Sequence, residues 1–119
     1  MKKHITKANK EIKKDEHGLM REISVGKPRY DLIYLPVLKD LAFLLARGAE
    51  KYDDNNWKSA NDVKALTSFK ASAWRHFVQY MEGEQDEAHH AAIMFNISAI
   101  EYLKDKLDVD INGVKNEKV

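Results

Sequence analysis

The sequence predicts an all-α fold whose core is three antiparallel helices. Apolar residues recur at helical spacing in three successive segments, polar loops separate these segments, and no convincing alternation of strands with helices is present. At 119 residues the chain is one domain with a modest core. We therefore also expect it to self-associate, as a dimer or a tetramer.

The first helix is predicted over residues 36–51. Pro36 suits a first helical turn, and apolar residues follow it at helical spacing as far as Ala49. Residues 31–35 before it are expected to form a short extended segment.

The second helix is predicted to begin after Asp62, a suitable N-cap, and to end at Gly83. The third is expected to begin after Asp86 and Glu87, because carboxylates favour the positive end of a helix dipole, and to end near Leu107. The apolar face of the second helix comprises Leu66, Phe69, Ala73, Phe77 and Tyr80 or Met81. That of the third comprises Ile93, Ile97, Ile100 and Leu107. Trp57 and Trp74 are expected in the core, unless one of them lines an open pocket.

Both ends are predicted to lie outside a helical domain at residues 26–107. Residues 1–25 form a basic arm, and residues 1–29 carry nine Lys or Arg against four Asp or Glu. Such an arm can attract nucleic acid, although a solvated leader is the more typical reading of this composition. Residues 108–119 form a polar tail, in which Asn112-Gly113 predicts a turn or a frayed end.

Composition excludes several classes of site. The chain has no cysteine, which excludes disulfides and thiolate zinc sites. No apolar stretch has the length of a membrane span or the character of a signal peptide, so the cytoplasm is the expected location. An HD-type phosphohydrolase is disfavoured because no His-Asp dipeptide occurs.

The segment from Gly48 to Trp57 carries the densest chemistry. It reads Gly-Ala-Glu-Lys-Tyr-Asp-Asp-Asn-Asn-Trp, with three carboxylates, a lysine, two amides and two aromatic rings. This mixture suits a site that holds a metal ion, a polyphosphate and a flat ring together. A surface turn would need only the Asp-Asp-Asn-Asn part.

Histidines on the second and third helices are the other candidates. His76 follows Arg75 and precedes Tyr80 by one turn. His89 and Asn96 are seven residues apart and share a helix face, where small residues leave room for a ligand or, more commonly, for another helix. The adjacent His89 and His90 point about 100° apart, so both cannot face one metal ion from a regular helix.

These motifs together resemble one family, the phage-encoded dATP/dGTP diphosphohydrolase N-terminal domain family. That family is similar to the all-α MazG-like nucleoside triphosphate pyrophosphohydrolases. The resemblance covers residues 26–107. Its motifs are Lys27-Pro28-Arg29-Tyr30-Asp31-Leu32-Ile33, Gly48-Ala49-Glu50-Lys51-Tyr52, Asn56-Trp57, Arg75-His76, Gly83-Glu84 and the stretch from His89 to Asn96.

The resemblance implies a hydrolase that splits a purine deoxynucleoside triphosphate into monophosphate and pyrophosphate with Mg²⁺ or Mn²⁺, in the cytoplasm of a bacterial host. The metal ligands it implies are Glu50, Asp53, Glu84 and Asp86. The implied catalytic residues are Lys51, which would neutralise phosphate, and His76 or His89, which would orient or deprotonate water. The implied nucleotide-binding residues are Arg29, Asn56, Trp57, Arg75, Tyr80 and Asn96.

The sequence also departs from the pattern of these enzymes. It has no adjacent Glu-Glu pair, its one Glu-x-x-Asp is Glu50 to Asp53, and Ala92 stands where a further histidine is expected. A protein of the same fold that binds a nucleotide without hydrolysing it, for example a host defence signal, is therefore the alternative. A nucleic-acid accessory factor acting through the basic arm is a third, weaker hypothesis.

Overall fold

The computed structural model describes residues 12–14, 16–22 and 25–117. These residues fall into two units, and the boundary between the units along the chain lies between Ile33 and Tyr34. In the N-terminal unit, β1 (Ile12–Lys14) and β2 (Met20–Glu22) form an antiparallel hairpin in which Ile12 pairs with Glu22. The 3-10 helix η1 (Tyr30–Leu32) follows. The sequence assigned no structure to this arm, so the hairpin is an addition. The prediction of an extended segment at residues 31–35 is wrong, because η1 covers its first residues and an α-helix begins at Leu35. Lys2, Lys3, Lys7 and Lys10 of the basic arm lie outside the described residues.

The helical unit contains α1 (Leu35–Tyr52), η2 (Asn56–Ser59), α2 (Val63–Met81) and α3 (His89–Leu107). The all-α prediction with three main helices is confirmed, and the boundaries agree to within a few residues. Asp62 is the N-cap of α2, since its Oδ1 accepts a hydrogen bond from the Ala65 N–H at 2.8 Å. Gly83, at φ +80°, provides the left-handed turn after α2.

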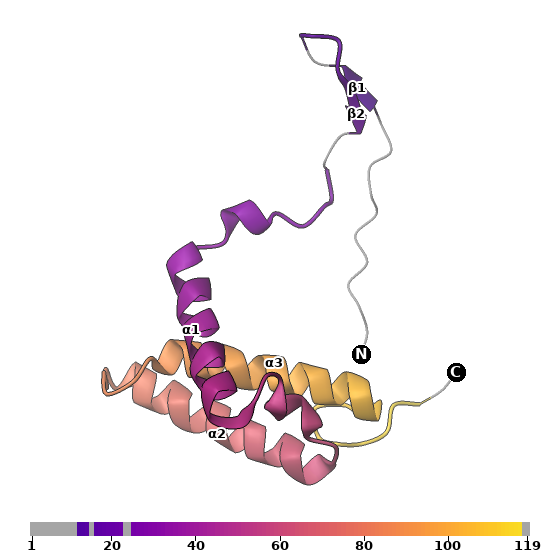
Figure 1. Ribbon diagram of the computed structural model, residues 1–119. Helices are drawn as coiled ribbons and strands as arrows, with labels where there is room; N and C mark the ends of the chain where they lie inside the picture. The colour runs from indigo at the N-terminus through magenta and orange to yellow at the C-terminus, as the bar shows by residue number, and fades with distance from the viewer. Residues whose placement is uncertain (1–11, 15, 23–24, 118–119) are drawn as a thin grey trace. The chain divides into compact units, whose positions relative to one another are not determined.

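Helices α2 and α3 lie side by side and antiparallel, joined by the short connection at residues 82–88, and α1 crosses them (Figure 1). The core comprises Leu66 of α2, Ile100 and Leu103 of α3, and Val109. Along the described residues, no helix has both the length and the apolar character that a membrane span requires.

The buried face of α3 agrees only in part with the predicted one. It comprises His89, Ala91, Ala92, Asn96, Ala99, Ile100 and Leu103. Ile97, which the periodicity placed in the core, is 52% exposed. Ile100 is buried as predicted, and Ile93 and Leu107 are half-buried. The small residues on the buried face let α2 approach closely.

The segment after α3 is a packed turn rather than a frayed end. Val109 is buried in the core and pairs across an isolated β-bridge with Lys115. Gly113 has φ +79°, and a Cβ built on it would lie 2.6 Å from Cγ1 of Val63. The predicted polar tail therefore closes the end of the helical unit near the first turn of α2.

We expect Gly113→Ala to destabilise the protein by about 1–3 kcal/mol, because it adds a left-handed alanine and a clash with Val63. Gly48→Ala is the matched control. Gly48 is helical with no atom within 4 Å of a built Cβ, so alanine there should leave the protein equally or more stable by about 0.5–1 kcal/mol. Urea unfolding of both variants measures the difference, and equal midpoints would contradict the packed turn.

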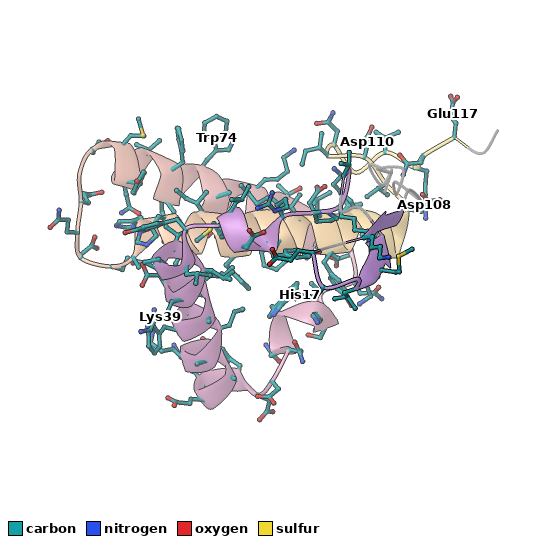
Figure 2. The ribbon with its side chains drawn as sticks, turned by 90° about the horizontal axis from the view of Figure 1, so that it is seen from above. His17, Lys39, Trp74, Asp108, Asp110 and Glu117 are labelled. Carbon is teal, nitrogen blue, oxygen red and sulfur yellow. The ribbon has the colours of Figure 1, made fainter. Side chains whose placement is uncertain are left out.

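Helices α1 and α2 each leave several apolar side chains exposed. None of the residues of α1 is buried. On α2, Phe77 is 43% exposed and Trp74 is 68% exposed, and the indole extends outward from the helix (Figure 2). The prediction that Trp74 belongs to the core is therefore wrong for the single chain. Trp74 shares an outward face of α2 with Phe77, Val78 and Met81, which α3 does not cover.

Candidate functional site

A pocket of about 840 Å³ opens between α1, η2 and the middle of α2 and α3. Gly48 and the whole stretch from Tyr52 to Ala60 line one side of it, and Phe69 and Phe95 line the other. Most of the motif that carried the densest chemistry in the sequence, namely Gly48, Ala49 and the residues from Tyr52 to Trp57, thus lines the pocket. Its volume is in the range of sites that hold small molecules and cofactors.

The backbone of this wall has an unusual conformation. Asp53 ends α1 with φ 92° and ψ 159°, a region that is otherwise occupied almost only by glycine. Asn55 has φ 59° and ψ 22°, a left-handed conformation that asparagine tolerates. The hydrogen bond from the Asp53 N–H to the Ala49 carbonyl, at 2.9 Å, holds the chain in place there. Such strain at a non-glycine residue is typical of functional positions.

Trp57 is half-buried and joins the pocket wall to α3. Its ring packs edge-on against Phe95 and Tyr102, with centroids 5.6 Å and 5.3 Å apart. Lys58, the next residue, also lines the pocket, and its Nζ lies 5.3 Å from the centre of the indole. Trp57 therefore lines a pocket, the exception that the sequence analysis allowed, and does not belong to the core cluster.

The remaining residues predicted around this motif are placed differently. Glu50 and Lys51 are exposed on the last turn of α1 and are not among the residues that line the pocket. Arg75 is exposed on α2. Arg29 belongs to the N-terminal unit, where its guanidinium donates to both carboxylate oxygens of Asp31 at 2.9 and 2.8 Å.

A second cluster of polar groups lies where α2 ends and α3 begins. Nδ1 of His76 is 2.9 Å from Nδ1 of His89, and the two side chains are buried between the helices. Nε2 of His89 is 2.8 Å from a carboxylate oxygen of Asp86, and Oε1 of Glu87 is 3.7 Å from Nδ1 of His76. The cluster therefore combines the two histidines that the sequence analysis selected as candidates with two acidic residues from the connection between α2 and α3.

The protonation of this cluster follows from its hydrogen bonds. Asp86 accepts a hydrogen bond from Nε2–H of His89, and this bond lowers the pKa of the Asp86 carboxyl, which stays ionised. With its proton on Nε2, His89 directs the lone pair of Nδ1 at His76. Burial lowers the pKa of His76, against the opposing effect of the nearby Glu87, and so favours its neutral form.

The adjacent histidine has a separate partner, as the angle between successive helical residues predicts. Nε2 of His90 lies 2.7 Å from a carboxylate oxygen of Asp40 on α1, and its ring lies 6.2 Å from that of Tyr80. Tyr80, predicted to bind nucleotide, thus lies beside this contact with half of its surface exposed. Asn96 is buried and donates from Nδ2 to the Ala92 carbonyl at 2.8 Å, so its amide serves the helix rather than the pocket.

The four predicted metal ligands are not gathered at one point. Glu50 and Asp53 lie at the end of α1, whereas Glu84 and Asp86 lie in the connection between α2 and α3. Within the described ranges, the group whose ligand atoms all lie within 4.8 Å of one another is instead His76, Glu87 and His89. Sequence reasoning had used Glu87 only as a helix-start signal, and its position next to Asp86 was the available clue. It also missed the pocket-lining rings of Phe69 and Phe95.

Comparison with known proteins agrees with these motifs. The family described as dATP/dGTP diphosphohydrolase, N-terminal, matches residues 18–110, which extends the resemblance beyond residues 26–107 at both ends. No curated protein matches the chain. No solved structure matches it either. Since the family match covers most of the sequence and contains the whole pocket, the chain belongs to the dATP/dGTP diphosphohydrolase N-terminal family.

Proposed function

We propose that this protein is a metal-dependent nucleoside triphosphate pyrophosphohydrolase that acts on purine deoxynucleotides in the cytoplasm. One observation carries the proposal: in the most distinctive motif of the family resemblance, Gly48 to Trp57, all residues except Glu50 and Lys51 line the pocket. The name of the family supplies the substrate class, dATP and dGTP.

The pocket has suitable groups for a purine. Tyr52, Trp57, Phe69 and Phe95 provide apolar and aromatic surface, and Asn56 contributes an amide that can both donate to and accept from a base edge. Concave sites of this kind commonly combine apolar walls with a few polar groups that fix the orientation of the ligand. The base would therefore sit between η2 and the two phenylalanines.

The triphosphate would extend toward the polar part of the wall. Lys58 lines the pocket, and Lys51 lies on the last turn of α1, with its Nζ 5.1 Å from the ring centre of the pocket-lining Tyr52. Either ammonium group can neutralise phosphate oxygens as they enter. The reaction joins a water oxygen to the α-phosphorus and breaks the bond from that phosphorus to the pyrophosphate oxygen.

The donors present fit Mg²⁺ or Mn²⁺. Asp53 and Asp54 place two carboxylates in the wall, with Glu50 one turn before them on α1. Mg²⁺ is commonly held by one or two carboxylates together with substrate phosphates, so a preformed cage of protein ligands is not required. When bound, the ion would neutralise the triphosphate and activate water. The strained Asp53 backbone would hold one carboxylate in position for it.

The test is incubation of the chain with dATP, dGTP and pyrimidine deoxynucleotides in the presence of Mg²⁺ or Mn²⁺. We expect monophosphate and pyrophosphate from the purine substrates and no turnover after chelation. Release of orthophosphate would contradict the proposed bond cleavage. Tight binding with the nucleotide recovered intact would favour a protein that binds nucleotide without hydrolysing it. This is the second candidate function, because the four predicted carboxylates lie in two separate segments.

Glu50→Gln should abolish turnover without unfolding the protein. The side chain is exposed and the amide is nearly the same size, so only the charge at the end of α1 is lost. Glu82→Gln, an exposed acidic residue at the end of α2, is the matched control and should retain activity. Full metal-dependent activity of Glu50→Gln would remove Glu50 from the site and leave Asp53 and Asp54 as the ligands.

Self-association is part of the proposal. Trp74, Phe77, Val78 and Met81 follow one another at helical spacing on α2, and all four are exposed by between 43% and 68%. An apolar stripe of this kind is typical of an interface, and a symmetric pair of chains would cover it. We expect a dimer or tetramer by light scattering, and dissociation by Trp74→Glu. Thr67→Glu, also exposed on α2, should leave the assembly intact. A monomeric parent protein would contradict the interface.

A further inference from the structure

We propose that His76, Glu87 and His89 form a second metal site, which binds a divalent transition ion such as Zn²⁺ through two imidazole nitrogens and one carboxylate. The site lies where α2 ends and α3 begins. It uses residues different from the carboxylates assigned to Mg²⁺ in the pocket wall, so its existence does not depend on the proposed hydrolysis.

The ligand atoms of the three side chains all lie within 4.8 Å of one another. Nδ1 of His76 and Nδ1 of His89 are 2.9 Å apart, and Oε1 of Glu87 lies 3.7 Å from the former. Zn–N and Zn–O bonds of about 2.0–2.2 Å place neighbouring ligand atoms of a tetrahedral site about 3.3 Å apart. Small side-chain rotations would bring all three atoms to that separation.

Asp86 provides the outer support that metal-binding histidines usually have. Its carboxylate, 2.8 Å from Nε2 of His89, holds the proton on that nitrogen and leaves the Nδ1 lone pair directed at the centre of the cluster. The hydrogen bond also orients the ring and makes Nδ1 a stronger donor to a metal. Asp86 was predicted as a direct ligand, and the structure gives it this supporting geometry instead.

The two buried rings can accept a cation without a change in their own charge. In its absence, a neutral His76 donates from Nδ1–H to the Nδ1 lone pair of His89 at 2.9 Å. A bound ion would take the place of this proton, which would move to Nε2 of His76, and both rings would be neutral ligands. The two carboxylates, Asp86 and Glu87, supply the charge that balances a dication.

The kind of metal follows from the donors. Two imidazoles and one carboxylate suit Zn²⁺ and the other late divalent ions, whereas Mg²⁺ prefers oxygen ligands only. The histidines are buried, but the Glu87 side chain is 56% exposed, so the ion faces solvent on one side. Three protein ligands with an accessible fourth position are typical of reactive rather than purely structural zinc sites.

The test is direct metal binding by the chelator-treated full chain, without nucleotide. Calorimetry with Zn²⁺ and absorption spectroscopy with Co²⁺ should each show one ion bound per chain. Addition of Mg²⁺ should not displace the bound Co²⁺. The exposed Glu87→Gln should weaken binding at least about 10-fold, and Asp86→Asn by about 10–100-fold. Neither variant removes a buried ring, so both should fold.

Glu84→Gln is the matched control in the same connection and should bind as the parent does. Equal weakening by Glu84→Gln and Glu87→Gln would overturn the site in favour of diffuse attraction to an acidic loop. Sub-stoichiometric binding by the parent chain would overturn it outright, as would an NMR signal for the proton between His76 and His89 that persists in excess Zn²⁺. Hydrolysis of dATP or dGTP is measured separately, so either proposal can fail alone.

Discussion

Asp53→Gly is expected to make the protein more stable and at the same time inactive. Asp53 has φ 92° and ψ 159°, a conformation that costs a non-glycine residue about 1–3 kcal/mol. Glycine relieves this strain, but it makes the unfolded chain more flexible, which lowers the free energy of unfolding by about 0.5–1 kcal/mol. The net increase in the free energy of unfolding is therefore about 1 kcal/mol. A rise of a few degrees in Tm should accompany it at fixed protein concentration.

The same substitution removes a carboxylate from the pocket wall. We expect pyrophosphate release to fall by at least about 100-fold. Loss of a residue that only hydrogen-bonds a metal ligand costs about 10–100-fold, and loss of a ligand itself should cost at least the upper value. Calorimetric melting and the nucleotide assay on one preparation measure both effects. A protein that gains stability and keeps its activity would place the metal elsewhere, and one that loses stability would show that the wall is not strained at Asp53.

Asn55→Gly is the matched control for this pair of effects. Asn55 lies two residues away in the same wall, with φ 59°, where asparagine is tolerated and glycine gains only a few tenths of a kcal/mol. It removes an amide rather than a charge. Near-parental Tm and turnover in this variant would attribute the effects of Asp53→Gly to the strained carboxylate and not to a more flexible loop.

Leu103→Ala should produce the largest loss of stability. Leu103 is fully buried on α3, where it packs with Leu66, Ile100 and Val109. Truncation of a buried leucine costs about 2–5 kcal/mol, because the apolar contacts are lost and a cavity remains. That is a large part of the stability of a typical small domain. Urea unfolding measures it through the midpoint at constant slope.

Ile97→Ala, on the same helix, is the comparison that tests which face is buried. Ile97 is 52% exposed, so its truncation should change stability by no more than about 1 kcal/mol. Helical periodicity alone assigned Ile97 to the core. A larger loss of stability in Ile97→Ala than in Leu103→Ala would restore that assignment.

The helices themselves were predictable because their signals are local. Pro36, the Asp62 cap and Gly83 each act on the residues beside them, and the structure confirms all three at or next to the predicted boundaries. The error at Ile97 of α3 has a different origin. Apolar periodicity groups Ile97 with the buried Ile100, but close packing against α2 buried a face rich in alanine and left Ile97 exposed.

In the candidate site, too, some features were predictable from the local sequence and others depended on tertiary structure. The composition of Gly48 to Trp57 was sufficient to identify a ligand-binding segment, since its residue types are adjacent in the chain. Which groups share a site was decided by tertiary structure alone. Glu87 and His89 meet His76 only because the short connection folds α3 back along α2. By itself, the sequence determined the family, the helices and the pocket wall. The contact between His76 and His89 required the packing of two helices, because it joins residues thirteen positions apart that no local rule relates.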